Sequence, residues 1–353
     1  MDAIKDLVEI SKYAGERIDI VQAGGGNSSV KNEQGQLIIK ASGFTLSDLT
    51  MEKGYAKVDN QKVLDLFATE LPTDKKAIET SGNVALTEAH LEGPRASIET
   101  FLHALTLRVT LHSHPIIVNL LVAQKDCEKI IHKLFPEALL VPYFTPGLEL
   151  GLAFDLEYKK AKETGKKPKV AFFKNHGLLV TGDTVEEVIE LNEQVLLKLE
   201  AYFKLDMSEY RNGSQVSKLV NETCGTDWIG WKSTNPELTK LWGDENKAIK
   251  AGPLFPDQMV FNGHAPVWLA NFTDGQAIKD YQTENISPPK MAILGKDLYL
   301  LAPNLKKAKE MEDVLLSQLL VFSKLEQSQL DFLSKEELSY LDNWESEKYR
   351  QKI

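Results

Sequence analysis

The chain has 353 residues, of which 42% are hydrophobic and 26% charged, so it is long enough to bury a large core and to form two domains. Its formal net charge of −10 argues against a nucleic-acid partner, because no basic excess is present to neutralise phosphates. Lysines do gather at 159–169, but acidic residues flank them, a pattern typical of solvated surface.

The sequence favours a reducing, cytoplasmic environment. Cys127 and Cys224 lie far apart and outside any CxxC pair, so no disulfide framework is expected. The first residues include acids where a signal peptide would be basic and then apolar. No apolar run approaches the length of a membrane span, and we expect no membrane partner.

The first third of the chain predicts a helix followed by strands. Apolar residues at helical spacing predict a helix over 3–14. A glycine-rich loop then leads to a hairpin with strands at 27–31 and 37–41, and another short strand follows at 56–59. Residues 72–94 are a polar stretch with weak periodicity, for which no element is assigned.

A second group of elements carries the chain to residue 205. Pro94 can begin a helix that continues over 96–105, and the branched, alternating run 107–112 predicts a strand. Strands are also expected at 169–173 and 178–181. Thr184 and Glu187 have the capping-box spacing and begin a long helix that reaches about Leu205. Strands mixed with enclosing helices predict an α/β layered domain over 1–205.

Residues 206–353 are expected to form a smaller α/β C-terminal domain. Residues 206–258 are polar without a strong period, whereas apolar segments occur at 265–272, 290–294 and 298–301, before a helix over 305–325. Three tryptophans lie in the polar stretch: Trp228, Trp231 and Trp242. They could stack on a sugar, but packing in a core or an interface is the favoured interpretation.

Three histidines have the pattern of a catalytic metal site. His112 and His114 are two residues apart at the end of a predicted strand, so both side chains lie on one face. His176 stands in a predicted turn beside Gly177, where an imidazole can project freely. Three neutral imidazoles suit Zn²⁺ and leave an open coordination position. The remaining candidates, His90, His132 and His264, lack such context and are expected on the surface or in packing.

Glu99 and His103 are four residues apart, so both project from one face of the helix expected over 96–105. They are either a solvated surface pair or a functional pair. In the functional interpretation, Glu99 transfers protons next to the metal, and His103 supports or packs against it.

Two turns could hold an anion. Gly24–Gly26 lack the spacing of a dinucleotide-binding or P-loop motif, but consecutive glycines followed by Asn27 and Ser28 can form a small nest of backbone N–H groups. Ser42-Gly43 is a second candidate of this kind. A simple tight turn is the alternative for each.

Taken in order, these motifs resemble the class II aldolase/adducin family. The matching segments are 25–30, 39–43, 97–99 with His103, 112–114, 142–143 and 175–178. The triple-glycine loop and the 95–99 segment are most similar to the aldolase part of bifunctional rhamnulose-1-phosphate aldolase/dehydrogenase proteins. Residues 255–260 also look similar to the end of that aldolase part.

The resemblance implies a fold and a set of roles. The expected fold is a three-layer α/β/α domain with a central, mostly antiparallel sheet, in a homo-oligomer that is commonly a tetramer. His112, His114 and His176 would hold one Zn²⁺ per chain, with Glu99 as acid/base and Tyr143 at the position of a proton-donating tyrosine. The implied substrate and phosphate contacts are Gly26, Asn27, Ser28, Ser42, Gly43, Arg95 and Ser97. Ile98 replaces a serine that binds phosphate in some members.

The function implied is zinc-dependent cleavage of a ketose 1-phosphate, similar to rhamnulose or fuculose phosphate, into dihydroxyacetone phosphate and an aldehyde. A ketopentose-phosphate 4-epimerase would use the same metal site. An adducin-like binding module is a further alternative, although such modules lack the histidines present here. The identity of the sugar, its phosphorylation and the role of 206–353 stay open.

Overall fold

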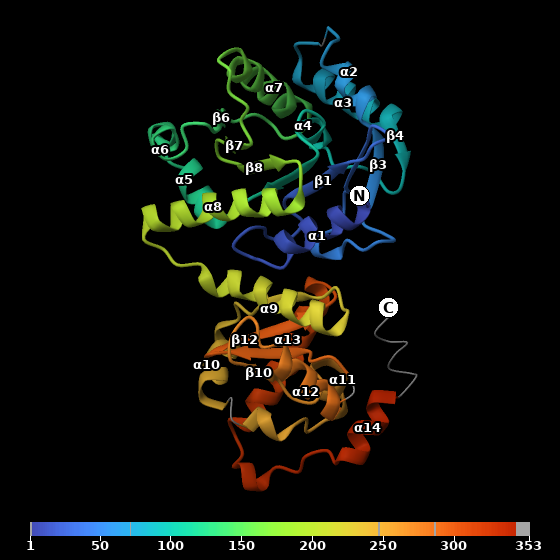
Figure 1. The fold of residues 1–353 in the computed structure, drawn as a ribbon, viewed down its shortest axis with the longest axis vertical. Helices are drawn as coiled ribbons and strands as arrows, with labels where there is room; N and C mark the ends of the chain where they lie inside the picture. Colours follow the sequence, from blue (N-terminus) through green and yellow to red (C-terminus); the bar gives the residue numbers. More distant parts are fainter. Residues whose placement is uncertain (1, 71, 246–247, 286, 344–353) are drawn as a thin grey trace. The chain divides into compact units, whose positions relative to one another are not determined.

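The computed structural model describes residues 2–70, 72–245, 248–285 and 287–343 (Figure 1). By its internal contacts the chain divides into two compact units, Met1–Met207 and Ser208–Ile353. Each unit contains its own sheet, and the two are described separately.

An eight-stranded sheet forms the centre of the first unit. Its strands are β1 (Asn27–Lys31), β2 (Gln36–Lys40), β3 (Tyr55–Asp59), β4 (His90–Glu92), β5 (Val109–Ser113), β6 (Leu139–Val141), β7 (Val170–Phe173) and β8 (Gly177–Gly182). The strand order is β4-β3-β2-β1-β5-β8-β7-β6. Only β6 and β7 pair in parallel, so the expected mostly antiparallel sheet is confirmed.

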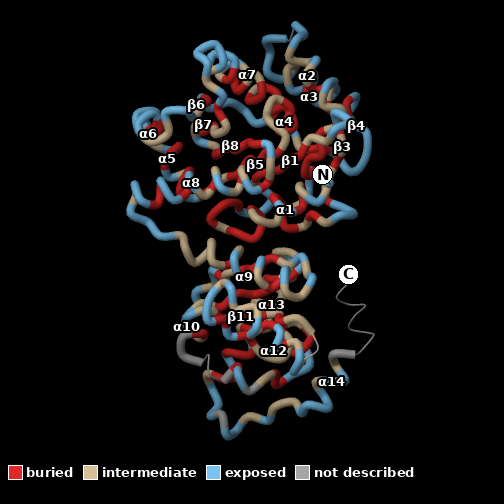
Figure 2. The backbone as a smooth tube through the Cα atoms, in the orientation of Figure 1, coloured by how far each residue is buried: buried red, intermediate tan, exposed pale blue. Residues whose placement is uncertain are grey.

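Helices cover both faces of this sheet. One face packs against α1 (Ala3–Gly15), the 3-10 turn η1 (Leu46–Asp48), α5 (Ile116–Val122), α6 (Cys127–Leu134) and α8 (Val185–Phe203). The other face packs against α2 (Asn60–Leu66), α3 (Lys75–Ala89), α4 (Thr100–Ala104) and α7 (Leu148–Glu163). Figure 2 shows the buried residues following the strands between these two layers. The predicted three-layer α/β/α fold is therefore confirmed.

Local capping explains where the long helices begin. The Asp2 side chain accepts hydrogen bonds from the backbone N–H groups of Ile4 and Lys5 at the start of α1. Thr184 caps α8 by accepting from the Glu187 N–H at 3.2 Å, and the helix ends at Lys204, in the left-handed conformation with φ 56°. The helix predicted from Thr184 to about residue 205 is confirmed.

One segment without an assigned element is helical, and one predicted helix is shorter than expected. The polar segment 72–94 contains α3, whose apolar side is sparse: only Gly82, Leu86 and Ala89 are buried. The helix expected over 96–105 begins only at Thr100, because the preceding backbone pairs with the end of β2, where Ala41 and Ala96 form a β-bridge. Elements α5, α6, β6 and α7 were not predicted from the sequence.

The second unit is a smaller α/β domain, as expected. Its sheet has the order β10-β11-β12-β9, with β9 (Ile229–Lys232), β10 (Val267–Leu269), β11 (Met291–Leu294) and β12 (Asp297–Ala302). The parallel pair β10–β11 is joined through α12 (Gly275–Asn285). The other helices are α9 (Ser208–Cys224), α10 (Pro236–Glu245), η2 (Ala248–Ala251), α11 (Pro256–Asn262), α13 (Leu305–Phe322), η3 (Gln327–Gln329) and α14 (Lys335–Asn343). Helices α9 and α10 lie in the segment where no periodicity was recognised.

The tryptophans of the second unit serve packing. Trp231 and Trp242 are buried, and each indole N–H has an acceptor: a Glu312 carboxylate oxygen at 3.2 Å and the Lys296 carbonyl at 3.0 Å, respectively. Trp228 packs, half-buried, against the core around Tyr299. The packing interpretation of these residues is confirmed.

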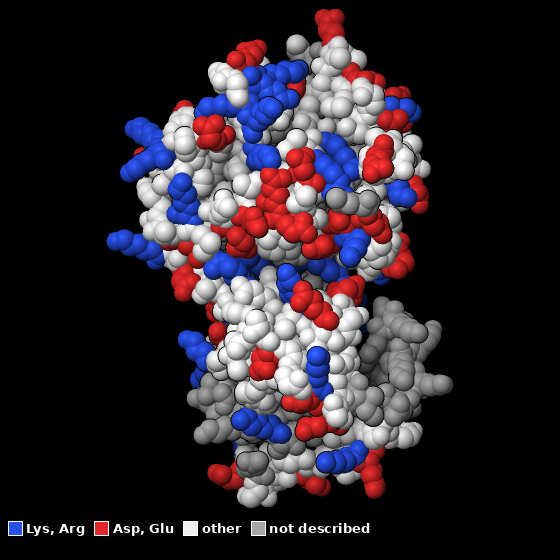
Figure 3. Space-filling model, in the orientation of Figure 1, with Lys and Arg blue, Asp and Glu red and all other residues white. Residues whose placement is uncertain are grey.

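The distribution of surface charges and the state of the two cysteines agree with what the composition predicts. Lysine, arginine and acidic side chains are interspersed on the face of the first unit seen in Figure 3. Cys127 and Cys224 are both free. None of the helices in the described part of the chain is long and apolar enough to cross a membrane.

Candidate metal centre

The three predicted histidines converge at one end of the first sheet. The Nε2 atom of His112 lies 3.3 Å from Nε2 of His114 and 3.3 Å from Nε2 of His176. One ligand atom from each ring lies within 4.8 Å of the other two. Metal–nitrogen bonds of about 2.0–2.1 Å in a tetrahedral site separate neighbouring donors by roughly 3.3–3.4 Å. The two distances from His112 therefore match the edges of a tetrahedral metal site.

Strand pairing brings His176 to the other two histidines. Ser113 at the end of β5 pairs with Leu178 at the start of β8, so the turn before β8 lies beside His112 and His114. Gly177 makes this approach possible: a Cβ atom there would collide with the Ser113 carbonyl oxygen and lie 2.8 Å from Cδ2 of His114. A side chain at position 177 would thus displace the turn that carries His176.

His112 is held in a ligating orientation. Its ring is fully buried, and Nδ1–H donates to the Leu178 carbonyl at 2.9 Å. This hydrogen bond fixes the tautomer that leaves the Nε2 lone pair directed at the other imidazoles.

Glu99 brings a carboxylate to the same point. Its Oε1 atom lies 3.5 Å from Nε2 of His112 and 3.3 Å from Nε2 of His176. Its other oxygen, Oε2, accepts from Nδ2 of Asn27 at 2.6 Å. Oε1 is buried and has no hydrogen-bond partner among the described residues. A buried carboxylate oxygen normally has a partner, and a cation held by the imidazoles would supply it.

The predicted relation between Glu99 and His103 needs correction. Glu99 is the residue before α4 and not a member of it, so the two side chains do not share a helix face. They are joined through Asn27 instead, because His103 Nε2 contacts Asn27 Oδ1 while Nδ1 lies 2.7 Å from Ser29 Oγ. His103 is fully buried, and it fixes the amide that holds Glu99.

The electrostatics of the cluster favour a charged Glu99 and a neutral His114. Burial raises the pKa of Glu99, but His112 and His176 outweigh burial and hold it well below its usual range. The pKa of His114 falls to about 3 because of burial and the nearby His112 and His176. His112 differs: burial lowers its pKa, but Glu99 raises it above the usual value. Neutral imidazoles and an ionised carboxylate are the forms that bind a metal ion.

Some predicted anion-binding residues adjoin this cluster. Asn27 Nδ2 lies 3.3 Å from Ser97 Oγ as well as beside Glu99. Gly26 has φ +71°, and a Cβ there would lie 2.9 Å from the His112 carbonyl oxygen. Ser42 and Gly43 are exposed and lie next to the 95–99 segment, since the Ser42 N–H donates to the Arg95 carbonyl at 2.8 Å.

Ser28 and Arg95 are placed differently from the prediction. Strand alternation turns the Ser28 side chain toward α1, where its hydroxyl lies 2.6 Å from Ser11 Oγ and is fully buried, so it cannot contact substrate. The Arg95 side chain is exposed and donates to Asn83 Oδ1 on α3 at 3.1 Å. It lines a cavity of about 560 Å³ between α3 and the start of α7, and none of the three histidines lines that cavity.

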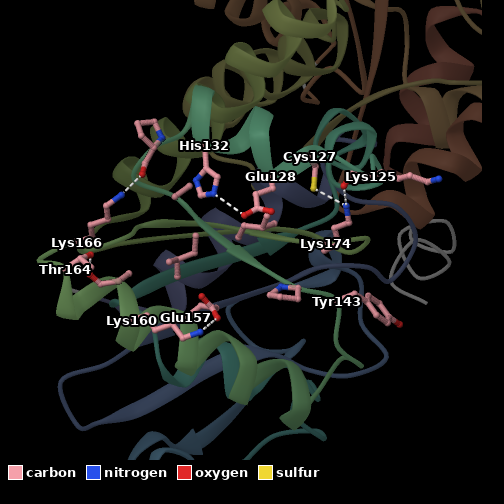
Figure 4. A pocket seen from close by; sticks show the side chains of 16 residues that line it. Lys125, Cys127, Glu128, His132, Tyr143, Glu157, Lys160, Thr164, Lys166 and Lys174 are labelled. Atoms are coloured by element: carbon pink, nitrogen blue, oxygen red, sulfur yellow. Dashed lines mark hydrogen bonds and ion pairs between the residues drawn. The ribbon is translucent and has the colours of Figure 1, made fainter.

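Tyr143 is also separate from the histidines. It is 58% exposed and lines another cavity, of about 700 Å³, between α6, β6 and α7. Figure 4 shows its ring pointing away from the other labelled side chains of that cavity. The three histidines do not belong to its lining.

One charged residue of this region was missed from the sequence. Lys40, the last residue of β2, is only 4% exposed. The signal was present, because a lysine interrupts the apolar run Leu37–Ala41 directly before Ser42-Gly43. A cation inside an otherwise buried strand is unusual and indicates a specific role.

Comparison with known families identifies one matching family model. The family model described as "Class II Aldolase and Adducin N-terminal domain" matches residues 5–202, more than half of the chain. The chain belongs to this family. The match covers every residue of the histidine cluster and ends close to the end of the first unit.

Solved structures of class II aldolase domains are similar to more than half of the chain. The N-terminal class II aldolase domain of a conserved protein from Thermoplasma acidophilum is 25% identical with a TM-score of 0.48, over 57% of this chain and 95% of that one. An L-fuculose-1-phosphate aldolase from Thermus thermophilus is 16% identical, with a TM-score of 0.38 over 58% and 95%. A sugar-phosphate aldolase from Thermotoga maritima is 17% identical, with a TM-score of 0.39 over 57% and 94%. Comparison with curated protein sequences found no match.

Proposed function

We propose that this chain is a zinc-dependent aldolase that cleaves a ketose 1-phosphate, similar to rhamnulose or fuculose phosphate, into dihydroxyacetone phosphate and an aldehyde. The observation that carries the proposal is the convergence of three imidazole nitrogens and one unpartnered carboxylate oxygen, Glu99 Oε1, among the described residues. Membership of the class II aldolase and adducin family supports it.

His112, His114 and His176 would hold one zinc ion per chain. Their tetrahedral spacing and all-nitrogen donor set suit zinc better than the oxygen-preferring Mg²⁺ or Ca²⁺. A bound zinc ion supplies Lewis acidity, which stabilises negative charge on the oxygens of the ketose as its carbon–carbon bond breaks.

Glu99 would transfer the proton at carbon. When the bond between C3 and C4 breaks, the C4 hydroxyl loses its proton and the electron pair of the bond stays on C3. The Glu99 carboxylate takes up a proton and delivers it to C3, so that the proton lost from the C4 hydroxyl balances the one gained at carbon. In the condensation direction the Glu99 carboxylate removes the same proton. Asn27 steadies this group through its 2.6 Å hydrogen bond to Oε2, which leaves Oε1 facing the imidazoles. We do not assign the proton at the C4 hydroxyl to Tyr143, because that residue lines another cavity.

The Glu99→Gln variant tests this assignment. We expect turnover to fall by about 10²–10⁴-fold, because an amide cannot exchange the proton at carbon. Zinc content, measured by elemental analysis, should stay near one ion per chain, because the three histidines remain. Release of dihydroxyacetone phosphate provides the activity readout, and the exposed Glu52→Gln variant is the matched control. Wild-type turnover in the Glu99→Gln variant would contradict the role of Glu99 in proton transfer.

The same assay separates the aldolase from an epimerase. Both reactions would use the histidine cluster and Glu99, so they differ only in the fate of the aldehyde. An epimerase returns a ketose phosphate of inverted configuration and releases no dihydroxyacetone phosphate. Product analysis with each class of ketose phosphate therefore decides between them.

A further inference from the structure

The imidazole of His176 lacks the support that the imidazole of His112 has. In His112, Nδ1–H donates to the Leu178 carbonyl at 2.9 Å, and this bond orients the ring. The Nδ1 atom of His176 is buried and has no hydrogen-bond partner among the described residues. A histidine that binds a metal normally donates its second ring nitrogen to an acceptor, which fixes the orientation of the ring. The position of the His176 imidazole therefore depends on the backbone turn that carries it.

The end of helix α5 holds this turn. The Asn175 N–H donates to the carbonyl of the last residue of α5 at 3.3 Å. The Lys174 ammonium group donates to the carbonyls that follow, those of Gln124 at 2.5 Å and Lys125 at 3.4 Å. The carbonyl end of a helix carries partial negative charge, so a cation is favoured there. Both residues that precede His176 are thus bonded to the same helix end.

The Lys174 side chain is used entirely for this attachment. Figure 4 shows it beside Lys125 and Cys127, within the lining of the cavity between α6, β6 and α7. Its Nζ lies 3.3 Å from Sγ of Cys127, the buried first residue of α6. Two carbonyls and one thiol match the three N–H donors of an ammonium group. Lys174 therefore serves as an anchor and keeps no donor for a ligand of the cavity.

Helix α5 also begins next to a second candidate ligand. Pro115, the residue before the helix, follows His114 directly, and Asn119 Nδ2 donates to the His114 carbonyl at 3.3 Å. The helix has seven residues, so its ends are about 10 Å apart. Its beginning is bonded to the backbone of His114, and its end is bonded to the turn of His176. Through Lys174, α5 therefore connects these two histidines in addition to the pairing of β5 with β8.

We propose that Lys174 is a positioning residue of the metal centre, because it fixes the turn that carries His176 to the end of α5. Through the backbone it gives the His176 imidazole the support that a hydrogen bond gives to His112. Lys174 takes no part in the chemistry itself. The effect on the metal rests on the proposed function, whereas the effect on the turn requires no metal.

Hydrogen exchange of the metal-free chain tests the anchor. In Lys174→Met, amide exchange measured by mass spectrometry should become about tenfold faster in peptides that contain residues 175–178, the factor expected for the loss of one charge-assisted hydrogen bond. The rest of the sheet should stay as protected as in the wild type. Lys174→Arg should retain most of the protection, because a guanidinium group can donate to the same carbonyls. Unchanged exchange of 175–178 in Lys174→Met would overturn the proposal.

Lys166→Met is the matched control. Lys166 lines the same cavity and also donates to a backbone carbonyl, that of Pro136 at 2.6 Å. Its bond lies outside the 174–178 turn, so its loss should leave the exchange of 175–178 unchanged. Faster exchange of these residues in both variants would assign the effect to the loss of any lysine of the cavity and would contradict a specific anchor.

Metal binding provides a second readout. Lys174→Met should bind zinc about 10–100-fold more weakly in competition with a chromogenic chelator, as is typical when a group that orients a ligand is removed. With Co²⁺ in place of zinc, the visible absorption spectrum reports the geometry of the ligands, so it should change in Lys174→Met and return in Lys174→Arg. A lysine that only stabilises the fold would lower the melting temperature and leave this spectrum unchanged. That outcome would contradict a positioning role.

The inference and the proposed function fail in different ways. A wild type that binds neither zinc nor Co²⁺ would overturn the metal-dependent aldolase, and hydrogen exchange would still decide whether Lys174 anchors the turn. A wild type that binds zinc, with Lys174→Met equal to it in affinity and spectrum, would overturn the inference and leave the aldolase function standing. If Lys174→Met fails to fold, Lys174→Gln replaces it in all of these measurements.

Discussion

Buried polar side chains around the candidate metal centre are hydrogen-bonded to one another. Asn27 is bonded to Glu99 and His103, and His103 is bonded in turn to Ser29. Burial lowers the pKa of His103 to about 3, so the ring stays neutral and can accept one of these hydrogen bonds while donating the other. The orientation of Glu99 is therefore set by groups that carry no charge at neutral pH.

Lys31 gives a prediction about pH. This side chain on β1 donates to the carbonyls of Thr106 and Leu107, and burial lowers its pKa to about 7. An unfolded lysine has a pKa of about 10.4, so between these values the unfolded chain binds more protons than the folded one. The free energy of unfolding should therefore rise with pH from about 7 to 10. Denaturant titrations across this range should show the rise in the wild type and a smaller rise in Lys31→Met. If the free energy of unfolding of Lys31→Met rises with pH as steeply as that of the wild type, other groups cause the rise.

At the scale of elements, the end of β5 and the turn between β7 and β8 position the three histidines of the candidate metal centre. The sequence was sufficient for this part. Alternation fixes His112 and His114 on the strand end, and Asn175-His176-Gly177 has the residues of a turn, with φ 52° at Asn175. The pairing of β5 with β8 then brings this turn next to the end of β5.

Gly177 gives a prediction for this element. The Gly177→Ala variant forces a Cβ against the Ser113 carbonyl and the His114 ring, which should destabilise the fold by about 1–3 kcal/mol. It should also weaken zinc binding at least tenfold, because the turn carrying His176 must move. Chemical denaturation and competition with a chromogenic chelator measure the two effects. Gly275→Ala is the control, because its new Cβ would meet only ordinary contacts of 3.5 Å or more. Unaltered zinc affinity in Gly177→Ala would contradict the role of this turn.

Other elements could not be predicted, for physical reasons that differ. Helix α3 buries only three small or apolar residues, so its periodicity is too weak to recognise. The segment 95–99 looks helical by composition but forms a bridge with Ala41, which is a tertiary contact. Ser28 lies within a matching motif, yet the alternation of β1 turns it toward Ser11. The burial of Lys40 could not be predicted, because a lysine in a strand usually indicates an exposed edge.

On the scale of the whole molecule, the identified donors of the candidate site all come from the first unit. Its donors come from residues 99–176, all within Met1–Met207. The second unit has its own sheet and its own core around Tyr299 and Leu301. Assembly into a tetramer stays a prediction from the family resemblance, and light scattering coupled to size-exclusion chromatography tests it.

Zinc removal gives a prediction at this scale. An ion that binds only the folded chain adds stability according to its concentration over its Kd, about 4 kcal/mol at a thousandfold excess. Treatment with a chelator should therefore lower the melting temperature of the first unit's transition and abolish turnover. Added zinc should restore both, whereas Mg²⁺ should not. A transition insensitive to chelation in a preparation shown to contain zinc would contradict a metal held by the histidine cluster.

The pairing of β5 with β8 also has a consequence for biosynthesis. His112 and His176 are 64 residues apart in the chain, so their nitrogens meet only after a large loop has closed and β8 has joined the sheet. A nascent chain that has emerged only as far as His114 offers two of the three imidazoles that are proposed to hold zinc. Loading of the metal is therefore expected to be a late event that follows completion of the central sheet.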